Sequence, residues 1–186
     1  MKVLVTGFAP FGGDTINPSY EAVRRLPARL VSRGGMLDVV TAELPTSFAR
    51  APRKLQALIA RVQPEIVLCV GLAAERAAIC VERIAVNFCD ARIADNDGAQ
   101  PRDKPVVARA PAAYFSTLPV TAIVQALVEG AGGTVSAHGI VHVIAKHIGC
   151  TSVAIELRRK NMPGQRRGEK KRTPGKAVQH DFSGRA

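Results

Sequence analysis

The chain has 186 residues, a length typical of one domain with a sizeable core. Hydrophobic residues make up 47% of it and aromatic residues only 4%, which argues against the base-stacking surface of a single-strand nucleic-acid binder. The net charge of +11 is concentrated at the end, because residues 157–186 contain ten Lys or Arg and two acidic residues. We therefore expect one globular unit, residues 1–157, and a basic, disordered tail, residues 158–186.

The four cysteines show neither CxxC pairing nor a His at metal-ligand spacing. We expect reduced thiols in a cytoplasmic protein that uses no metal and no other cofactor. No apolar run reaches the length of about eighteen residues that a membrane-spanning helix needs, and the apolar start lacks the features of a signal peptide. Membranes and nucleic acid are therefore not expected as partners, and binding of nucleic acid through the basic tail is only a weaker hypothesis.

The first half of the chain alternates between strand and helix patterns. In order, these are a strand at 2–6, a helix that begins after Asn17, a strand at 37–44, a helix at 47–62 and a strand at 66–71. Asn17, Pro18 and Glu21 give the first helix an N-cap, a first-turn proline and an early acid, and Pro64 ends the second helix. This alternation predicts an α/β fold in a single domain, with a mostly parallel sheet and helices on both faces.

The second half continues with weaker patterns. We expect a strand at 79–88, a polar loop at 90–109, a helix from about Pro119 to 129, and two strands at 140–145 and 152–157. A loop as long as 90–109 is usually functional or mobile.

One residue of the strand at 79–88 is out of place. Glu82 lies between Val81 and Ile84 in a segment built for burial, and burying an unpaired carboxylate is costly. An ion pair with Arg83 or Arg76 would account for it, and so would a functional partner.

A glycine-rich segment, TGFAPFGG at residues 6–13, follows the first strand and precedes a helix, where α/β proteins place ligand loops. It is not a phosphate loop, because no Lys follows its glycines and the GxGxxG pattern is absent. Phe8 and Phe11 could line a small apolar pocket there, or they could simply pack in the core.

Seven blocks in this sequence resemble the pyroglutamyl peptidase I family, the pyrrolidone carboxyl peptidases, in order and at the family's spacing from Lys2 to about Leu127. The blocks are TGFAPFGG, NPS at 17–19, ELP at 43–45, CVG at 69–71, VERIAVN at 81–87, DARIADN at 90–96 and APAAYFSTLPVTAIVQAL at 110–127. The resemblance implies a cysteine-type omega peptidase that hydrolytically removes N-terminal pyroglutamate from peptides. Members of this family often assemble as tetramers.

The resemblance also implies catalytic roles. A Cys is the nucleophile of these enzymes, a His is its base, and a Glu, here Glu82, orients the His and stabilises the imidazolium. Arg92 matches an arginine near the catalytic thiol, where a cation can stabilise the oxyanion. The alternative for Arg92 is a loop salt bridge with Asp90 or Asp95.

Three more residues match the family's substrate site. Phe8 and Phe11 match the aromatic residues that sandwich the flat pyrrolidone ring, and Asn17 matches an asparagine near the lactam. A neutral ring with an amide edge calls for such a pocket, with apolar faces and a few hydrogen bonds.

The match breaks in the last third. The family pattern next requires a segment like GTFVCNH, which supplies the nucleophile, and later a motif that supplies the His, and neither is present after Gly130. Cys150, in HIGCTS, has no other residue of that motif, and a substitute site would need positioning that an unrelated segment rarely provides. The candidates for such a substitute base are His138, His142 and His147. We expect instead that the cysteines, at 69, 80, 89 and 150, are small buried hydrophobes.

Two functional hypotheses follow. One is a pyroglutamyl peptidase that has lost its Cys and His motifs and has little or no activity. The other is an inactive homologue that only binds pyroglutamyl groups. Without its His, Glu82 should pair with an Arg, face water or take up a proton, because desolvation raises the pKa of a carboxyl group.

Overall fold

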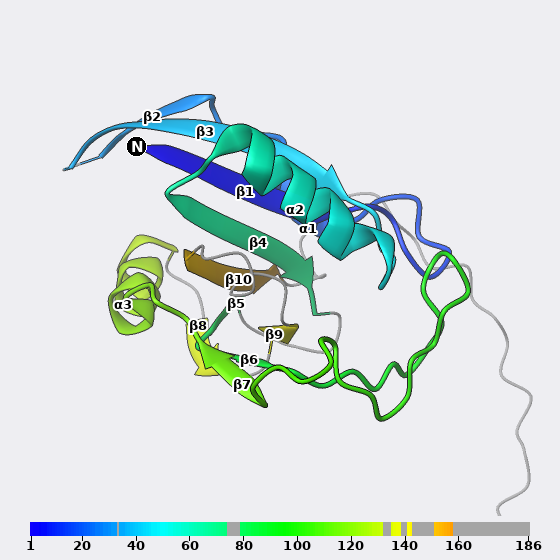
Figure 1. Ribbon diagram of the computed structural model, residues 1–186. Helices are drawn as coiled ribbons and strands as arrows, with labels where there is room; N and C mark the ends of the chain where they lie inside the picture. Colours follow the sequence, from blue (N-terminus) through cyan, green and yellow to red (C-terminus); the bar gives the residue numbers. More distant parts are fainter. Residues whose placement is uncertain (33, 74–78, 132–134, 139–140, 143–150, 158–186) are drawn as a thin grey trace, which may run out of the picture.

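The structure is a computed structural model that describes residues 1–32, 34–73, 79–131, 135–138, 141–142 and 151–157. A main sheet has seven strands in the order β2-β3-β1-β4-β10-β5-β8, and a smaller one has the order β7-β6-β9 (Figure 1). The main sheet consists of β1 (Lys2–Phe8), β2 (Arg29–Ser32), β3 (Gly35–Leu44), β4 (Ile66–Leu72), β5 (Ile79–Glu82), β8 (Val135–His138) and β10 (Thr151–Leu157). The smaller sheet consists of β6 (Ile84–Val86), β7 (Ala113–Phe115) and β9 (Val141–His142).

Most strand pairs of the main sheet are parallel. β1 pairs in parallel with β3 and β4, β10 with β4, and β5 with β8. Among the described strands of this sheet, only the β2–β3 and β10–β5 pairs are antiparallel. The expected mostly parallel sheet is confirmed.

Helices cover both faces of this sheet. They are α1 (Pro18–Val23), α2 (Arg50–Val62) and α3 (Val120–Ala131). Leu4 packs in one cluster with Leu55 of α2, whereas its neighbour Val5 packs in another cluster with Val23 of α1. Because successive strand residues point to opposite faces, α1 and α2 must lie on opposite sides of β1. α3 packs through Val120 onto β5 in a third cluster (Figure 1).

The start of α1 follows the sequence signals closely. The Asn17 side chain accepts a hydrogen bond from the Ser19 N–H, and Pro18 occupies the first turn. The helix lies so close to β1 that a Cβ atom at Gly7 would be 2.5 Å from Cα of Tyr20. Glycine at this position therefore allows the helix to pack directly against the strand.

The structure differs from the expected elements in four places. β2 forms a hairpin with β3 that the sequence patterns did not predict. The expected strand at 79–88 is broken at Arg83 into β5 and β6, which belong to different sheets. Neither β7 nor β8 was predicted from the sequence. The strand at 152–157 is confirmed as β10, whereas most of the strand expected at 140–145 and the whole tail at 158–186 lie outside the described residues.

Candidate active site

The ligand loop, residues 7–13, leaves the end of β1 and is fixed to the start of α1. The Phe8 N–H donates to Oγ of Ser19 at 2.9 Å, and Nδ2 of Asn17 donates to the Ala9 carbonyl at 2.9 Å. Phe8 and Phe11 are both half-buried, and Phe8 packs against the core cluster beneath α2. The structure thus brings Phe8, Phe11 and Asn17 together in one short stretch, with Asn17 acting on the backbone between the two rings.

Two further segments reach the same loop. Oγ1 of Thr46, between β3 and α2, donates to the Ala9 carbonyl at 2.8 Å. Nδ2 of Asn96 donates to the Pro10 carbonyl at 2.8 Å, and the Asn96 N–H donates to the Thr46 carbonyl at 3.1 Å. The long loop that connects β6 to β7, residues 87–112, therefore lies against the ligand loop, as its green trace does in Figure 1.

Asp95 anchors this long loop. Its carboxylate accepts hydrogen bonds from the backbone N–H groups of Phe48 at 2.7 Å, Asp97 at 2.9 Å and Ala99 at 2.8 Å. Burial raises the pKa of Asp95, but these hydrogen bonds outweigh burial and hold the pKa below its ordinary value. Arg50 of α2 also forms a bidentate ion pair with Asp97. The loop is thus attached to the fold rather than loosely connected.

Arg92 is exposed on this loop, and within the described part of the chain no ion pair holds its guanidinium group. Asp90 pairs instead with Arg102 at 3.3 Å, and Asp95 is occupied by backbone N–H groups. The alternative of a loop salt bridge for Arg92 is therefore not found.

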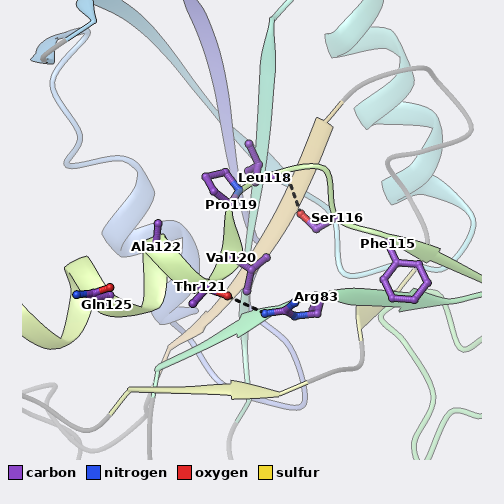
Figure 2. A pocket seen from close by; sticks show the side chains of 9 residues that line it. All are labelled: Arg83, Phe115, Ser116, Leu118, Pro119, Val120, Thr121, Ala122 and Gln125. Carbon is purple, nitrogen blue, oxygen red and sulfur yellow. Dashed lines mark hydrogen bonds between the residues drawn. The ribbon is translucent and has the colours of Figure 1, made fainter.

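Glu82 ends β5 and is 2% exposed, so the option that this carboxylate faces water is wrong. Arg83 does not serve as its ion-pair partner, because Nη2 of Arg83 extends to Oγ1 of Thr121 at 3.0 Å (Figure 2). In the parallel pairing of β5 with β8, His138 lies opposite Glu82. From the sequence, this His was expected only as one of three candidates for a substitute base.

The ligand loop and Glu82 are carried by strands that β4 and β10 separate. Three strand spacings correspond to about 14 Å between the axes of β1 and β5. The intervening β10 reads TSVAIEL and contains neither Cys nor His. Cys150 and His147 lie outside the described residues.

None of the described cysteines has the features of an activated nucleophile, which is a depressed pKa in a partly exposed setting. Cys80 and Cys89 are buried, as expected, and Cys69 is half-buried. Burial raises the pKa of Cys69 by more than the Thr6 hydroxyl lowers it. Burial, with the charge of Asp90, also raises the pKa of Cys89.

A cavity of about 570 Å³ opens where β7 meets the start of α3 (Figure 2). Its lining residues are Arg83, Phe115, Ser116, Leu118, Pro119, Val120, Thr121, Ala122 and Gln125. None of the substrate-site residues suggested by the sequence lines this cavity. Elsewhere in the described residues, no group of three or more His, Cys, Asp or Glu side chains could hold a metal ion, and no helix there is long and apolar enough to span a membrane.

Sequence reasoning missed Thr46 and Asn96 as residues of the site and treated Asp95 only as a partner for Arg92. A local signal for Asp95 is present in DNDG at 95–98, a turn sequence in which Gly98 takes φ 80° and donates to the Asp95 carbonyl at 3.0 Å. No local signal points to Thr46.

The arrangement is that of an α/β protein with a ligand loop after its first strand and a buried glutamate on the same sheet. The family model for pyroglutamyl peptidase matches residues 1–158. The chain therefore belongs to the pyroglutamyl peptidase family, a family of cysteine-type omega peptidases.

Known relatives agree with this assignment. The chain is 54% identical over 135 residues to the pyrrolidone-carboxylate peptidase of Pectobacterium atrosepticum, a match that covers 72% of this chain and 61% of the relative. It is 46% identical over 157 residues to pyrrolidone-carboxylate peptidase 1 of Ralstonia nicotianae, covering 78% and 72%. The crystal structure of pyroglutamyl peptidase I from Bacillus amyloliquefaciens superimposes with a TM-score of 0.75 at 33% identity, covering 84% of this chain and 81% of that one.

The family model extends past Leu127, where the visible motifs end, to residue 158. The matched region nevertheless spans less than two thirds of several curated relatives, for example 58% of the Treponema denticola enzyme.

Proposed function

We propose that this chain binds the N-terminal pyroglutamyl group of peptides at the ligand loop, and that it hydrolyses the following amide little or not at all. The observation that carries this proposal is the fixed backbone between Phe8 and Phe11, where the Ala9 carbonyl accepts from both Asn17 and Thr46. A rigid loop with two half-buried rings suits a flat lactam, because a preorganised site loses little entropy on binding.

The hydrogen bonds refine the role of Asn17. Its Oδ1 accepts from the N–H and Oγ of Ser19, and one N–H of its amide donates to Ala9. Since the amide nitrogen carries two N–H groups, one can still donate to a lactam oxygen. Asn17 would thus hold the loop and present a donor to the ligand.

Of the two proposed activities, binding and hydrolysis, hydrolysis is the weaker. In the family reaction a His takes the proton of the Cys thiol, and the resulting thiolate attacks the scissile carbonyl. The His then gives this proton to the leaving amine, and water hydrolyses the acyl-enzyme. This chain retains Glu82 and Arg92 but lacks the motifs that supply Cys and His. In triad enzymes, loss of the nucleophile or the base removes most of the acceleration and leaves what oxyanion stabilisation and binding provide.

A second candidate is an active peptidase with a rebuilt base. The strand register that pairs His138 with Glu82 favours it, because it brings a residue of each type that orients and supplies the base of a Cys–His site onto neighbouring strands. This candidate still requires a nucleophile, and Cys150 would have to supply it.

Incubation of the purified protein with a pyroglutamyl anilide separates these candidates. We expect no turnover above the buffer rate, together with a rise in melting temperature when pyroglutamate is added, since a ligand that binds only the folded state stabilises it. Turnover at ordinary enzyme rates that Cys150→Ser abolishes would favour the rebuilt peptidase. Cys80→Ser is the matched control, because Cys80 is buried beside Glu82 on β5. If the protein shows no turnover and pyroglutamate gives no thermal stabilisation, the proposal is refuted.

The resemblance also suggests that the chain forms a homo-oligomer, a tetramer in this family, and the free thiols of Cys69, Cys80 and Cys89 support a cytoplasmic location. Light scattering of the purified protein would test the first inference.

A further inference from the structure

Phe11 is the less firmly held of the two rings proposed to bind the lactam. Phe8 ends a strand and packs against the core, whereas Phe11 lies on the loop and is followed by Gly12 at φ 66° and Gly13 at φ 83°. Open space surrounds the position where a Cβ atom would lie on either glycine, so this end of the loop has little steric restraint. The Asp14 N–H donates to the Phe11 carbonyl at 3.3 Å, but this contact stays within the same connection between β1 and α1. The spacing between the two rings therefore depends on the contacts that hold Ala9 and Pro10.

Three side chains hold these two residues, and two of them come from distant parts of the chain. The Ala9 carbonyl accepts from Asn17 and Thr46, which occupies both of its lone pairs, and the Pro10 carbonyl accepts from Asn96. Thr46 and Asn96 are linked in turn, because the Asn96 N–H donates to the Thr46 carbonyl. The two carbonyls are thus fixed relative to α1, the β3–α2 connection and the long loop at once.

We propose that Thr46 and Asn96 are positioning residues that set the distance between Phe8 and Phe11, and with it the affinity and ring-size selectivity of the site. This inference rests on the proposed function, because it takes the lactam as the ligand. Thr46 acts through a hydroxyl group that donates to a main-chain oxygen, so its role depends on that O–H rather than on the bulk of its side chain.

A matched pair of substitutions tests this dependence. Thr46→Val keeps the shape and removes the hydroxyl, whereas Thr46→Ser keeps the hydroxyl and removes the methyl. Calorimetry would measure the affinity for pyroglutamamide and for its six-membered lactam analogue. We expect Thr46→Val to weaken binding of pyroglutamamide about five- to tenfold, the range for one lost hydrogen bond, and to reduce the preference for the smaller ring. Thr46→Ser should stay within about twofold of the parent chain.

Thr121→Val is the control, because Oγ1 of Thr121 accepts from Arg83 in the cavity of Figure 2, which the ligand loop does not line. It removes a hydrogen-bonded threonine hydroxyl of the same size and should leave affinity and ring preference unchanged. A general loss of stability would affect both valine variants without changing the ring preference.

Hydrogen exchange of residues 8–14 in the free protein provides a readout without any ligand. Thr46→Val should accelerate exchange there, and Thr46→Ser should not. If the parent chain binds pyroglutamamide and both Thr46 variants bind it as tightly as the parent chain does, the inference is wrong. If the parent chain does not bind it, the proposed function fails; faster exchange in Thr46→Val alone would then retain the positioning role, and unchanged exchange would remove that role as well.

Discussion

Asp95→Asn should destabilise the fold through a single reversed hydrogen bond. In the parent chain Oδ1 of Asp95 accepts from Asp97 and Ala99, while Oδ2 accepts from Phe48 at 2.7 Å. Asparagine can keep its oxygen toward Asp97 and Ala99, but its NH₂ group then faces the N–H of Phe48. Two donors would meet where a charge-assisted hydrogen bond was, at a residue that is 9% exposed.

The expected cost is about 2–3 kcal/mol, because a hydrogen bond to a charged group contributes about 1.5–3 kcal/mol and the N–H of Phe48 loses its partner. For a domain of this size such a cost lowers the melting temperature by roughly 4–10 °C. Urea denaturation followed by circular dichroism would measure it. Asp90→Asn is the matched control, since Asp90 forms an exposed ion pair with Arg102 and its loss should cost less than about 1 kcal/mol.

The pH dependence gives a second test of the same hydrogen bonds. Because the folded-state pKa of Asp95 lies below its ordinary value, its stabilising contribution is present above the unfolded pKa of about 4 and disappears as the pH falls through the folded pKa. The stability difference between the parent chain and Asp95→Asn should therefore shrink in acid. An Asp95→Asn variant no less stable than Asp90→Asn, or a difference that stays constant down to low pH, would refute this reasoning.

Two other predictions concern packing and thiol chemistry. Gly7→Ala should cost about 3 kcal/mol or more in urea denaturation, because its Cβ atom would meet the backbone of Tyr20, which cannot move aside as a flexible side chain could. Gly13→Ala should cost only roughly 1–2 kcal/mol, the penalty for alanine in the left-handed backbone region, and equal losses in the two variants would contradict this reasoning. In a Cys150→Ser protein, the remaining thiols should react with a thiol reagent at pH 7 much more slowly in the native state than in denaturant. The reason is that burial raises the pKa of Cys69 and Cys89, so that little reactive thiolate is present. Fast labelling of the native protein would contradict this prediction.

Elements with local signals were predicted well. The N-cap and first-turn proline of α1 and the apolar runs of β1, β3 and β4 are each written within a few residues, so a short window contains the information. β2 was missed because it is an edge strand with every residue exposed, and Val31 is 83% exposed, which leaves no alternation of buried and exposed side chains to detect. The break at Arg83 was missed because apolar residues resume directly after it, so that the strand-like composition of β5 continues into β6.

The residues of the candidate site also divide into those with a local sequence signal and those without one. Phe8, Phe11 and Asn17 lie within ten residues, from the end of β1 to the N-cap of α1, so a motif could identify them together. Thr46 reaches Ala9 across 37 positions of sequence. Asn96 reaches Pro10 across 86 positions, and such long-range contacts follow only from the packing of the sheet.

The placement of these contacts along the chain supports the proposal that binding outlasts catalysis in this protein. Apart from the Asp14 N–H, which donates to the Phe11 carbonyl within the turn, the described hydrogen bonds to Phe8, Ala9 and Pro10 come from α1 and its N-cap, from the end of β3 and the connection that follows it, or from the long loop. All of these segments precede residue 113. The nucleophile and base motifs would come after Leu127, where the visible family motifs end. A change confined to that later part removes the groups that break the amide without touching any side chain that holds Ala9 or Pro10. Selection for binding alone would then act on the first 112 residues, and we expect the affinity for pyroglutamyl groups to be insensitive to substitutions beyond them.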